Sequence, residues 1–65
     1  MRYLVEVLTI EKNHARVIVD ANNTDEVIAK ISNVTDFICC HIFETFKMGD
    51  LDVCGTKSIF YENKK

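Results

Sequence analysis

The chain has no proline, no tryptophan and only two glycines among its 65 residues. Two glycines cannot build a glycine-rich loop around a phosphate, and neither a P-loop nor a dinucleotide fingerprint occurs. No apolar run approaches the roughly 20 residues that a helix needs to span a bilayer. A chain this short forms one domain without room for separate catalytic and cofactor domains, and we expect no cofactor.

Excess positive charge is also missing, because ten acids stand against eight bases and the net charge is −2. The bases are scattered along the chain: Arg2, Lys12, Arg16, Lys30, Lys47, Lys57, Lys64 and Lys65. Such a distribution lacks the basic field that drives binding to DNA or RNA, so we do not expect a nucleic-acid partner. A dimeric nucleic-acid-binding regulator that uses Arg2, Lys12, Arg16 and Lys30 stays open as an alternative.

The first residues, MRYLVE, do not have the pattern of a secretory signal, because Glu6 interrupts the apolar stretch. We therefore expect a cytoplasmic protein without a membrane partner. Frequent Asn, Lys and Ile and the lack of proline suggest a low-GC bacterium or its phage. A phage-encoded protein would act in the bacterial host cytoplasm.

Cysteine is present in an odd number, as Cys39, Cys40 and Cys54. Neighbouring residues of a strand face opposite sides, so Cys39 and Cys40 are poorly placed to bond to each other. We expect reduced thiols in a reducing compartment. A zinc site of Cys39, Cys40, His41 and Cys54 is the alternative, but three consecutive residues lack the spacing of structural zinc ligands, and no metal is expected.

The first twenty residues predict a hairpin. Tyr3–Ile10 (YLVEVLTI) and Ala15–Asp20 (ARVIVD) are rich in β-branched residues and read as two strands. The polar segment between them forms the turn, in which Asn13 is the residue best suited to a positive φ.

A helix follows the hairpin. Asn23 with Glu26 three residues later predicts a capped start, and the apolar residues then recur at helical spacing: Val27, Ile28, Ile31 and Val34. We expect the helix to end near Asn33 in a left-handed cap.

The second half of the chain is harder to interpret. Phe37–Phe46 (FICCHIFETF) has the aromatic and β-branched content of a strand, although a helix capped by Asp36 also fits. After a turn at 48–50 we expect a short strand at Leu51–Cys54, a break at Gly55, and a last strand at Thr56–Tyr61.

These elements predict an α+β domain over residues 1–61, in the order β-β-α-β-β-β, and a disordered polar tail at 62–65. A right-handed crossover through the helix sets the third strand parallel to the second, with the first strand between them and antiparallel to both. The antiparallel-dominated sheet has the order 2-1-3, one helix on one face, and a C-terminal hairpin that extends one edge or folds over it.

One helix can cover only one face of this sheet, and we assign that face to Tyr3, Val5, Val7, Val17 and Val19. The opposite face carries Leu4, Glu6, Leu8, Ile10, Arg16, Ile18 and Asp20. A face that meets water should alternate more strictly between apolar and polar residues. Its four large aliphatic residues therefore need a cover: the C-terminal hairpin, a second copy of the chain, or a different protein.

This surplus of apolar residues favours a small protein-interaction module, whose partner is another protein or a second copy in a homodimer. We expect Leu4, Leu8, Ile10 and Ile18 to supply the affinity. Five acids would orient the partner: Asp20, Asp25, Glu26, Asp50 and Asp52.

Catalysis has little support in the sequence, and we expect no enzyme and no catalytic residues. His14 lies in a turn, His41 lies in an apolar strand where histidine is usually a packed residue, and Ser32 and Ser58 have no His/Asp pattern nearby. A small histidine-dependent toxin or nuclease is the alternative.

The stretch from Tyr3 to Ile31 combines an alternating hairpin, an acidic helix cap and a helix with a D-E-x-x-x-K-like pattern. The residues that carry the pattern are Tyr3, Val5, Glu6, Val17, Val19, Ala21, Asp25, Glu26 and Lys30. In these it resembles DpnD/PcfM-type small proteins, while the chain after Asp36 departs from that pattern. The β-β-α-β outline is also similar to small phage-encoded host-takeover proteins, such as a coliphage inhibitor of bacterial RNA polymerase and some anti-CRISPR proteins. That resemblance implies an inhibitor that binds and occludes a larger host or defence protein.

Overall fold

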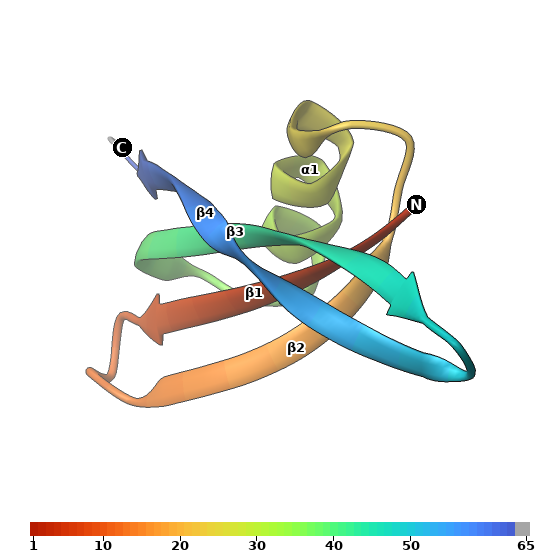
Figure 1. Cartoon of the computed structure of the whole chain (residues 1–65). Helices are drawn as coiled ribbons and strands as arrows, with labels where there is room; N and C mark the ends of the chain where they lie inside the picture. Colours follow the sequence, from red (N-terminus) through yellow and green to blue (C-terminus); the bar gives the residue numbers. More distant parts are fainter. Residues whose placement is uncertain (64–65) are drawn as a thin grey trace.

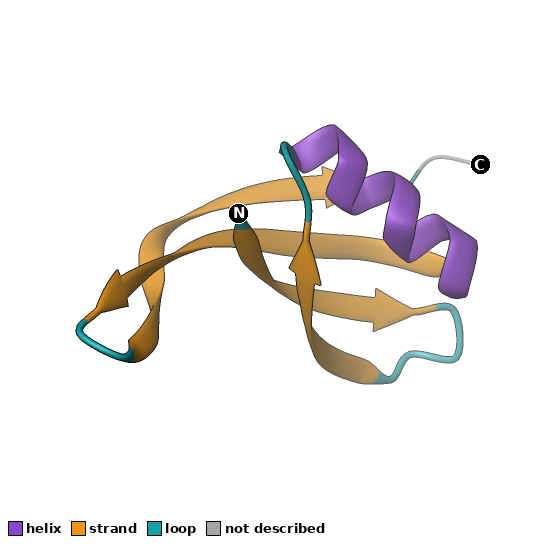
Figure 2. Cartoon of the chain, turned by 90° about the vertical axis from the view of Figure 1, so that its right-hand side faces the viewer, coloured by secondary structure: helices purple, strands orange, loops and turns teal. Residues whose placement is uncertain are grey.

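A computed structural model of the chain describes residues 1–63. Its elements follow in the order β1 (Arg2–Thr9), β2 (His14–Asp20), α1 (Thr24–Val34), β3 (Phe37–Met48) and β4 (Leu51–Glu62). All neighbouring strands are antiparallel, in the sheet order β2-β1-β3-β4, and α1 lies on one face (Figures 1 and 2). The predicted α+β class and the order 2-1-3 are confirmed.

The β1–β2 hairpin turns one residue earlier than predicted. The Thr9 backbone N–H donates to the Asn13 carbonyl at 2.9 Å, and the Lys12 N–H donates to the Thr9 carbonyl at 2.9 Å. Lys12, and not Asn13, therefore holds the left-handed position, with φ 66°. A short hairpin loop of this kind needs a left-handed residue, and here a lysine occupies that position.

The helix begins as predicted and ends differently. Asn23 caps it, because its side-chain oxygen accepts a hydrogen bond from the Glu26 backbone N–H at 2.9 Å. At the other end Thr35 is extended and its N–H donates to the Ile31 carbonyl at 3.0 Å. The expected left-handed cap at Asn33 is wrong, because the chain passes directly from α1 into an extended segment that leads to β3.

The segment after α1 is a strand, as favoured from its composition, and β3 pairs with both β1 and β4. The two strands expected at Leu51–Cys54 and Thr56–Tyr61 are one strand, β4. Gly55 does not end it, because the irregularity between the pairs Phe43–Ser58 and Thr45–Cys54 is absorbed as a bulge of β4. The C-terminal hairpin thus joins β3 to β4 and extends the sheet.

The tail starts later than predicted. β4 runs to Glu62, and Asn63 binds back to the sheet through its N–H to the Ile38 carbonyl and its side-chain amide to the Phe37 carbonyl. The rest of the predicted tail, 64–65, lies outside the described residues. Within residues 1–63, no helix has the length and apolar character to cross a bilayer.

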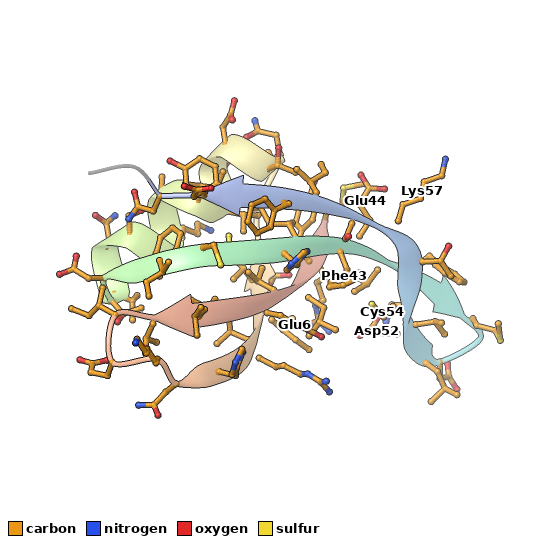
Figure 3. All side chains as sticks on the ribbon, turned by 90° about the vertical axis from the view of Figure 1, so that its left-hand side faces the viewer. Glu6, Phe43, Glu44, Asp52, Cys54 and Lys57 are labelled. Atoms are coloured by element: carbon orange, nitrogen blue, oxygen red, sulfur yellow. The ribbon has the colours of Figure 1, made fainter. Side chains whose placement is uncertain are left out.

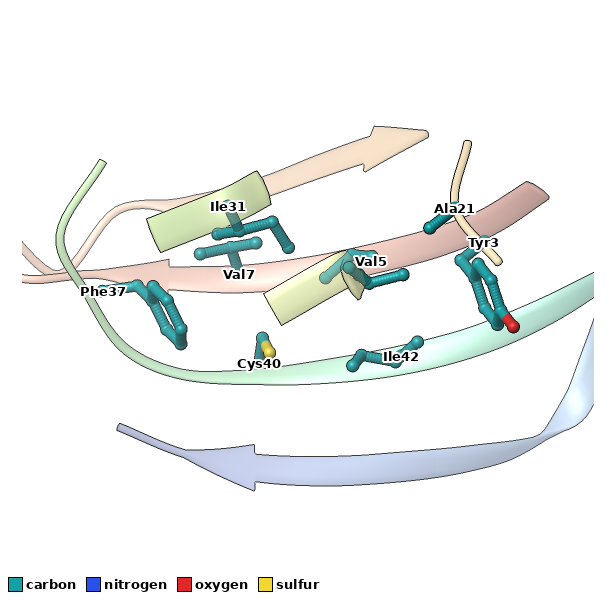
Figure 4. Packing of buried hydrophobic residues seen from close by; sticks show 9 residues of the cluster. Tyr3, Val5, Val7, Ala21, Ile31, Phe37, Cys40 and Ile42 are labelled. Carbon is teal, nitrogen blue, oxygen red and sulfur yellow. The ribbon is translucent and has the colours of Figure 1, made fainter. Parts of the chain in front are cut away.

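The core lies between α1 and the strands β1 and β3 (Figure 4). Its buried residues are Tyr3, Val5, Val7, Ala21, Val27, Ile31, Phe37, Cys40 and Ile42. The residues assigned to the helix face on β1 are therefore confirmed as core. Val19 is half-buried and Val17 is exposed, because β2 is an edge strand that α1 covers only in part.

Candidate functional site

The face of the sheet opposite α1 is not covered by any element of residues 1–63, and Figure 3 looks onto it. β4 adds to the edge of the sheet instead of folding across this surface, so the C-terminal hairpin does not provide the cover considered above. We call this surface the open face. Alternation along the strands assigns to it Leu4, Glu6, Leu8, Arg16, Ile18, Cys39, His41, Phe43, Ser58 and Phe60.

The pairing register arranges the open face in rows across the strands. Leu4 lies opposite Ile18 on one side and Phe43 on the other, which makes an apolar stripe over three strands. Ile18 is 63% exposed at the end of this stripe, while Leu4 and Phe43 are half-buried. Leu4 and Ile18 lie on one face, as predicted, and the pairing register shows that they are direct neighbours.

The next row carries charge and aromatic rings. Arg16 and Glu6 form an ion pair with 3.4 Å between Nε and Oε1. Beyond Glu6, His41 lies opposite Phe60, with 4.9 Å between their ring centroids, and Phe60 is 54% exposed. His41 is thus an exposed residue of the open face and not a packed core residue.

Two aromatic residues of the open face, Phe43 and Phe60, are not among the binding residues predicted from the sequence. The signal for Phe43 is the alternation within FICCHIFETF. Cys40 and Ile42 are buried on one face, so His41 and Phe43 lie on the other. Reading that signal requires knowing that the segment is a strand and which of its faces meets α1.

The other two predicted apolar residues lie away from the stripe. Leu8 is half-buried, opposite His14 and Cys39, near the β1–β2 loop. Ile10 lies in that loop and is exposed. It lines a small hollow with Asp36, Phe37, Ile38 and Asn63. The structure therefore brings together Leu4, Leu8 and Ile18 on one face, and leaves Ile10 at its margin.

Asp20 and Asp52 both bind the guanidinium of Arg2, with N–O distances of 3.3 and 2.8 Å. Lys47 adds an ion pair to Asp52 at 3.4 Å. The hydrogen bond from Lys47, more than the one from Arg2, holds the pKa of Asp52 below its ordinary value. These two acids gather at one end of the sheet, next to the open face.

The remaining predicted acids lie elsewhere. Asp25 and Glu26 occupy the first turn of α1, on the other side of the sheet, where acids favour the helix dipole. Glu26 also accepts from the Asn22 backbone N–H at 3.4 Å and pairs with Lys30 at 3.6 Å. Asp50 lies in the β3–β4 turn. The five acids thus do not form one continuous rim.

The bases named for the nucleic-acid alternative do not converge either. Arg2 binds Asp20 and Asp52, Arg16 binds Glu6, and Lys30 binds Glu26. Lys12 lies in the β1–β2 loop. Three of these four bases are compensated by acids of the same chain, so they present little positive field to a phosphate backbone.

The cysteines lie on different sides of the sheet. Cys40 is buried under α1, and burial, followed by the nearby Cys39, raises the pKa of its thiol to about 11. Cys39 belongs to the open face, Cys54 is exposed, and all three are free. Among residues 1–63 no three His, Cys, Asp or Glu side chains lie close enough together to hold a metal ion.

Beyond the body of the sheet, the last residues of β3 and the first residues of β4 protrude as a hairpin arm, which can be followed in Figure 1. The turn at its tip has Gly49 at φ 63°, between the paired residues Met48 and Leu51. Apolar residues alternate with charged ones along it, and three are exposed: Phe46, Met48 and Leu51. The molecule is therefore elongated, with principal extents of 39 × 21 × 18 Å.

A scan against protein-family models matches no family. Searches of the curated proteins and of the solved structures find no match either.

Proposed function

We propose that this chain is a small protein–protein interaction module that binds a larger protein through its open face. The observation that carries the proposal is the apolar stripe Leu4–Ile18–Phe43, which no described element of the chain covers. Exposed apolar surface with a polar border is typical of surfaces that bind other proteins.

The composition of the open face supports a protein as the ligand. Phe43 and Phe60 offer large rings, and aromatic residues at the centre of an interface contribute much of the binding energy. The ion pair Arg16–Glu6 and the group around Arg2 present charges of both signs at the border. The matching partner surface is an apolar patch surrounded by basic and acidic groups, which fix the orientation of the complex.

The proposed mode of action is occlusion. An elongated body of 39 Å can cover a functional surface of a larger protein without any chemistry of its own. We propose an inhibitor of this kind, acting on a host or defence protein in the bacterial cytoplasm. This finer assignment is supported by the small size of the chain and rests on the resemblance of its β-β-α-β outline to phage-encoded inhibitors, which was expected from the sequence.

The test uses two neighbouring residues of β4 that face opposite ways. Phe60 lies on the open face and Ile59 on the other, and they are similarly exposed, at 54% and 51%. Tagged wild-type chain should capture a stoichiometric partner from the source cells, and the complex should then be reconstituted from purified proteins. Phe60→Ser should raise its dissociation constant about tenfold or more, and Ile59→Ser should leave it nearly unchanged.

Two results would contradict this proposal. One is the absence of any stoichiometric partner. The other is an equal loss of binding in both serine variants, which would place the contact outside the open face. Salt-sensitive binding of the purified chain to DNA or RNA would instead favour the nucleic-acid regulator.

A further inference from the structure

The outer edge of β2 is a regular strand edge that carries no neighbour within residues 1–63. Its pairing with β1 runs without a shift from Arg2–Asp20 to Leu8–His14. The opposite edge of the sheet, β4, is interrupted by the bulge near Gly55. A bulge protects an edge from pairing, whereas a regular edge can accept another strand, so β2 is the open edge of this sheet.

The outward-pointing backbone groups of β2 can be identified from the ends of the hairpin. The Thr9 N–H donates to the Asn13 carbonyl, and the Ala21 N–H donates to the Met1 carbonyl. Alternation of the antiparallel ladder then turns the odd-numbered residues of β2 toward β1. The N–H and C=O groups of Arg16, Ile18 and Asp20 face the free edge. The Asp20 carbonyl accordingly accepts from the side chain of Lys30, which lies outside the ladder.

The sequence of this edge is complementary to itself when it is read in the opposite direction. Residues 16–20 are Arg-Val-Ile-Val-Asp, so an antiparallel copy presents Asp-Val-Ile-Val-Arg. With Ile18 opposite Ile18 of the second copy, each Arg16 faces an Asp20 and each Val17 faces a Val19. This register also sets the outward backbone groups of both copies against each other.

We propose that two copies of this chain pair through β2, antiparallel about Ile18, and form one continuous eight-stranded sheet with two-fold symmetry. The same patch serves both partners, as a two-fold interface requires. This proposal shares Leu4 and Ile18 with the proposed function. It is tested separately, because it rests on the edge of β2 and not on Phe43 or Phe60.

Charges within each copy reinforce the proposed register. Glu6 already pairs with Arg16 at 3.4 Å, and Arg2 with Asp20 at 3.3 Å. In the dimer a row of alternating charge would cross the junction in the order Glu6, Arg16, then Asp20 and Arg2 of the second copy. Two such rows would flank an apolar row in which the Leu4–Ile18 stripes of the two copies meet.

The surface of β2 on the helix side is also uncovered within residues 1–63 of one copy, and the second copy would cover it. An apolar groove of about 270 Å³ runs between β2 and α1, and its lining includes Ala15, Val17, Val19, Ile31 and Val34. Val34 is 85% exposed at its border. Pairing through β2 would set the Val17–Val19 rows of two copies side by side and join the two grooves into one apolar floor between the two helices.

The test is a charge exchange, read out as molar mass by sedimentation equilibrium over a wide range of concentrations. Wild type should dimerise. Arg16→Asp places two acids of one copy opposite two acids of the other, and Asp20→Arg places bases opposite bases, so each variant should be monomeric. Mixing the two variants should restore a dimer that contains one copy of each, and the double variant R16D/D20R should dimerise alone.

Circular dichroism of each variant shows whether it is folded, and the mixing experiment cannot succeed with unfolded chains. In the dimer, the amides of Arg16, Ile18 and Asp20 should exchange hydrogen more slowly as the concentration rises. A wild type that stays monomeric overturns the proposal. So do single variants that dimerise as the wild type does, or variants that fail to restore each other on mixing. None of these results changes what Phe60→Ser does to partner binding, so the two proposals can fail separately.

Discussion

Gly55 lies against the backbone of Glu44: a β-carbon on Gly55 would stand 3.0 Å from the Glu44 carbonyl oxygen. That oxygen belongs to β3 and has little freedom to move. The close approach occurs where β4 bulges between its pairs with Phe43 and Thr45. It explains why a glycine, which usually weakens a strand, is placed inside this one.

We therefore expect Gly55→Ala to lower the free energy of unfolding by about 1 to 3 kcal/mol, as overpacking does elsewhere. Urea denaturation followed by circular dichroism measures the change. Ser58→Ala, which also lies in β4 and pairs with Phe43 at the border of the bulge, is the control and should be nearly neutral. Equal stability of Gly55→Ala and wild type would mean that β3 yields easily at this point.

Lys12 carries a conformational cost, because it is a non-glycine residue with φ 66°. Lys12→Gly should raise the free energy of unfolding by about 0.5 to 1 kcal/mol, since glycine adopts the left-handed region without steric penalty. Lys12→Ala keeps the cost and removes the charge, so it should stay close to wild type in the same denaturation assay. A gain with alanine would point to charge as the cause.

The cap of α1 depends on one side chain. Asn23→Ala removes the acceptor for the Glu26 N–H and should cost about 1 kcal/mol, whereas Asn23→Asp preserves an acceptor and should cost much less. Thermal unfolding distinguishes the two variants. A similar loss in both would show that the amide group of Asn23 is needed for another contact.

The three thiols should differ in reactivity. In the folded protein at pH 8 an alkylating reagent should modify Cys54 first, because it is exposed. Cys40 should resist, because it is buried and its pKa of about 11 leaves little thiolate. Mass spectrometry of a time course gives the order, and in concentrated urea the difference should vanish. Early modification of Cys40 would contradict the packing of α1 on β3.

The ion pairs of Asp52 should make stability depend on pH. Its pKa is lowered in the folded state from an ordinary value of 3.8, so its contribution is present above pH 3.8 and is lost as the pH falls through the lower, folded-state pKa. The stability difference between wild type and Asp52→Asn should therefore shrink at acidic pH. It should also shrink in high salt, which screens exposed charges. A difference that is constant with pH would exclude this origin.

Much of the fold could be predicted because the first half of the chain has strong local signals. Alternating β-branched residues define the first hairpin, and Asn23 with Glu26 defines the helix start. The predictions are wrong at positions whose conformation depends on tertiary contacts. The break expected at Gly55 is wrong because a glycine inside a strand can also allow a close approach to the neighbouring strand. No local signal indicates that the chain leaves α1 at Thr35 in an extended conformation.

The candidate site was predictable only for strands whose register follows from a tight turn. Leu4 and Ile18 could be placed on one face because the β1–β2 hairpin sets their pairing. Phe43 and Phe60 depend on how β3 meets β1 across the helical crossover, which composition does not reveal. The five acids predicted to orient the partner share only their residue type. Asp25 lies in α1 and Asp50 in the β3–β4 turn, which the fold holds apart.

The seam between β1 and β3 determines how the chain reaches its structure. The hairpins β1–β2 and β3–β4 each close over a short loop, at a small entropic cost. Tyr3 and Glu44, by contrast, pair although they lie 41 positions apart in the sequence. Val27 and Ile31 of α1 pack into the core over this same seam. We therefore expect the two local hairpins to form first and to dock under the helix, with this long-range pairing as the slow step of folding.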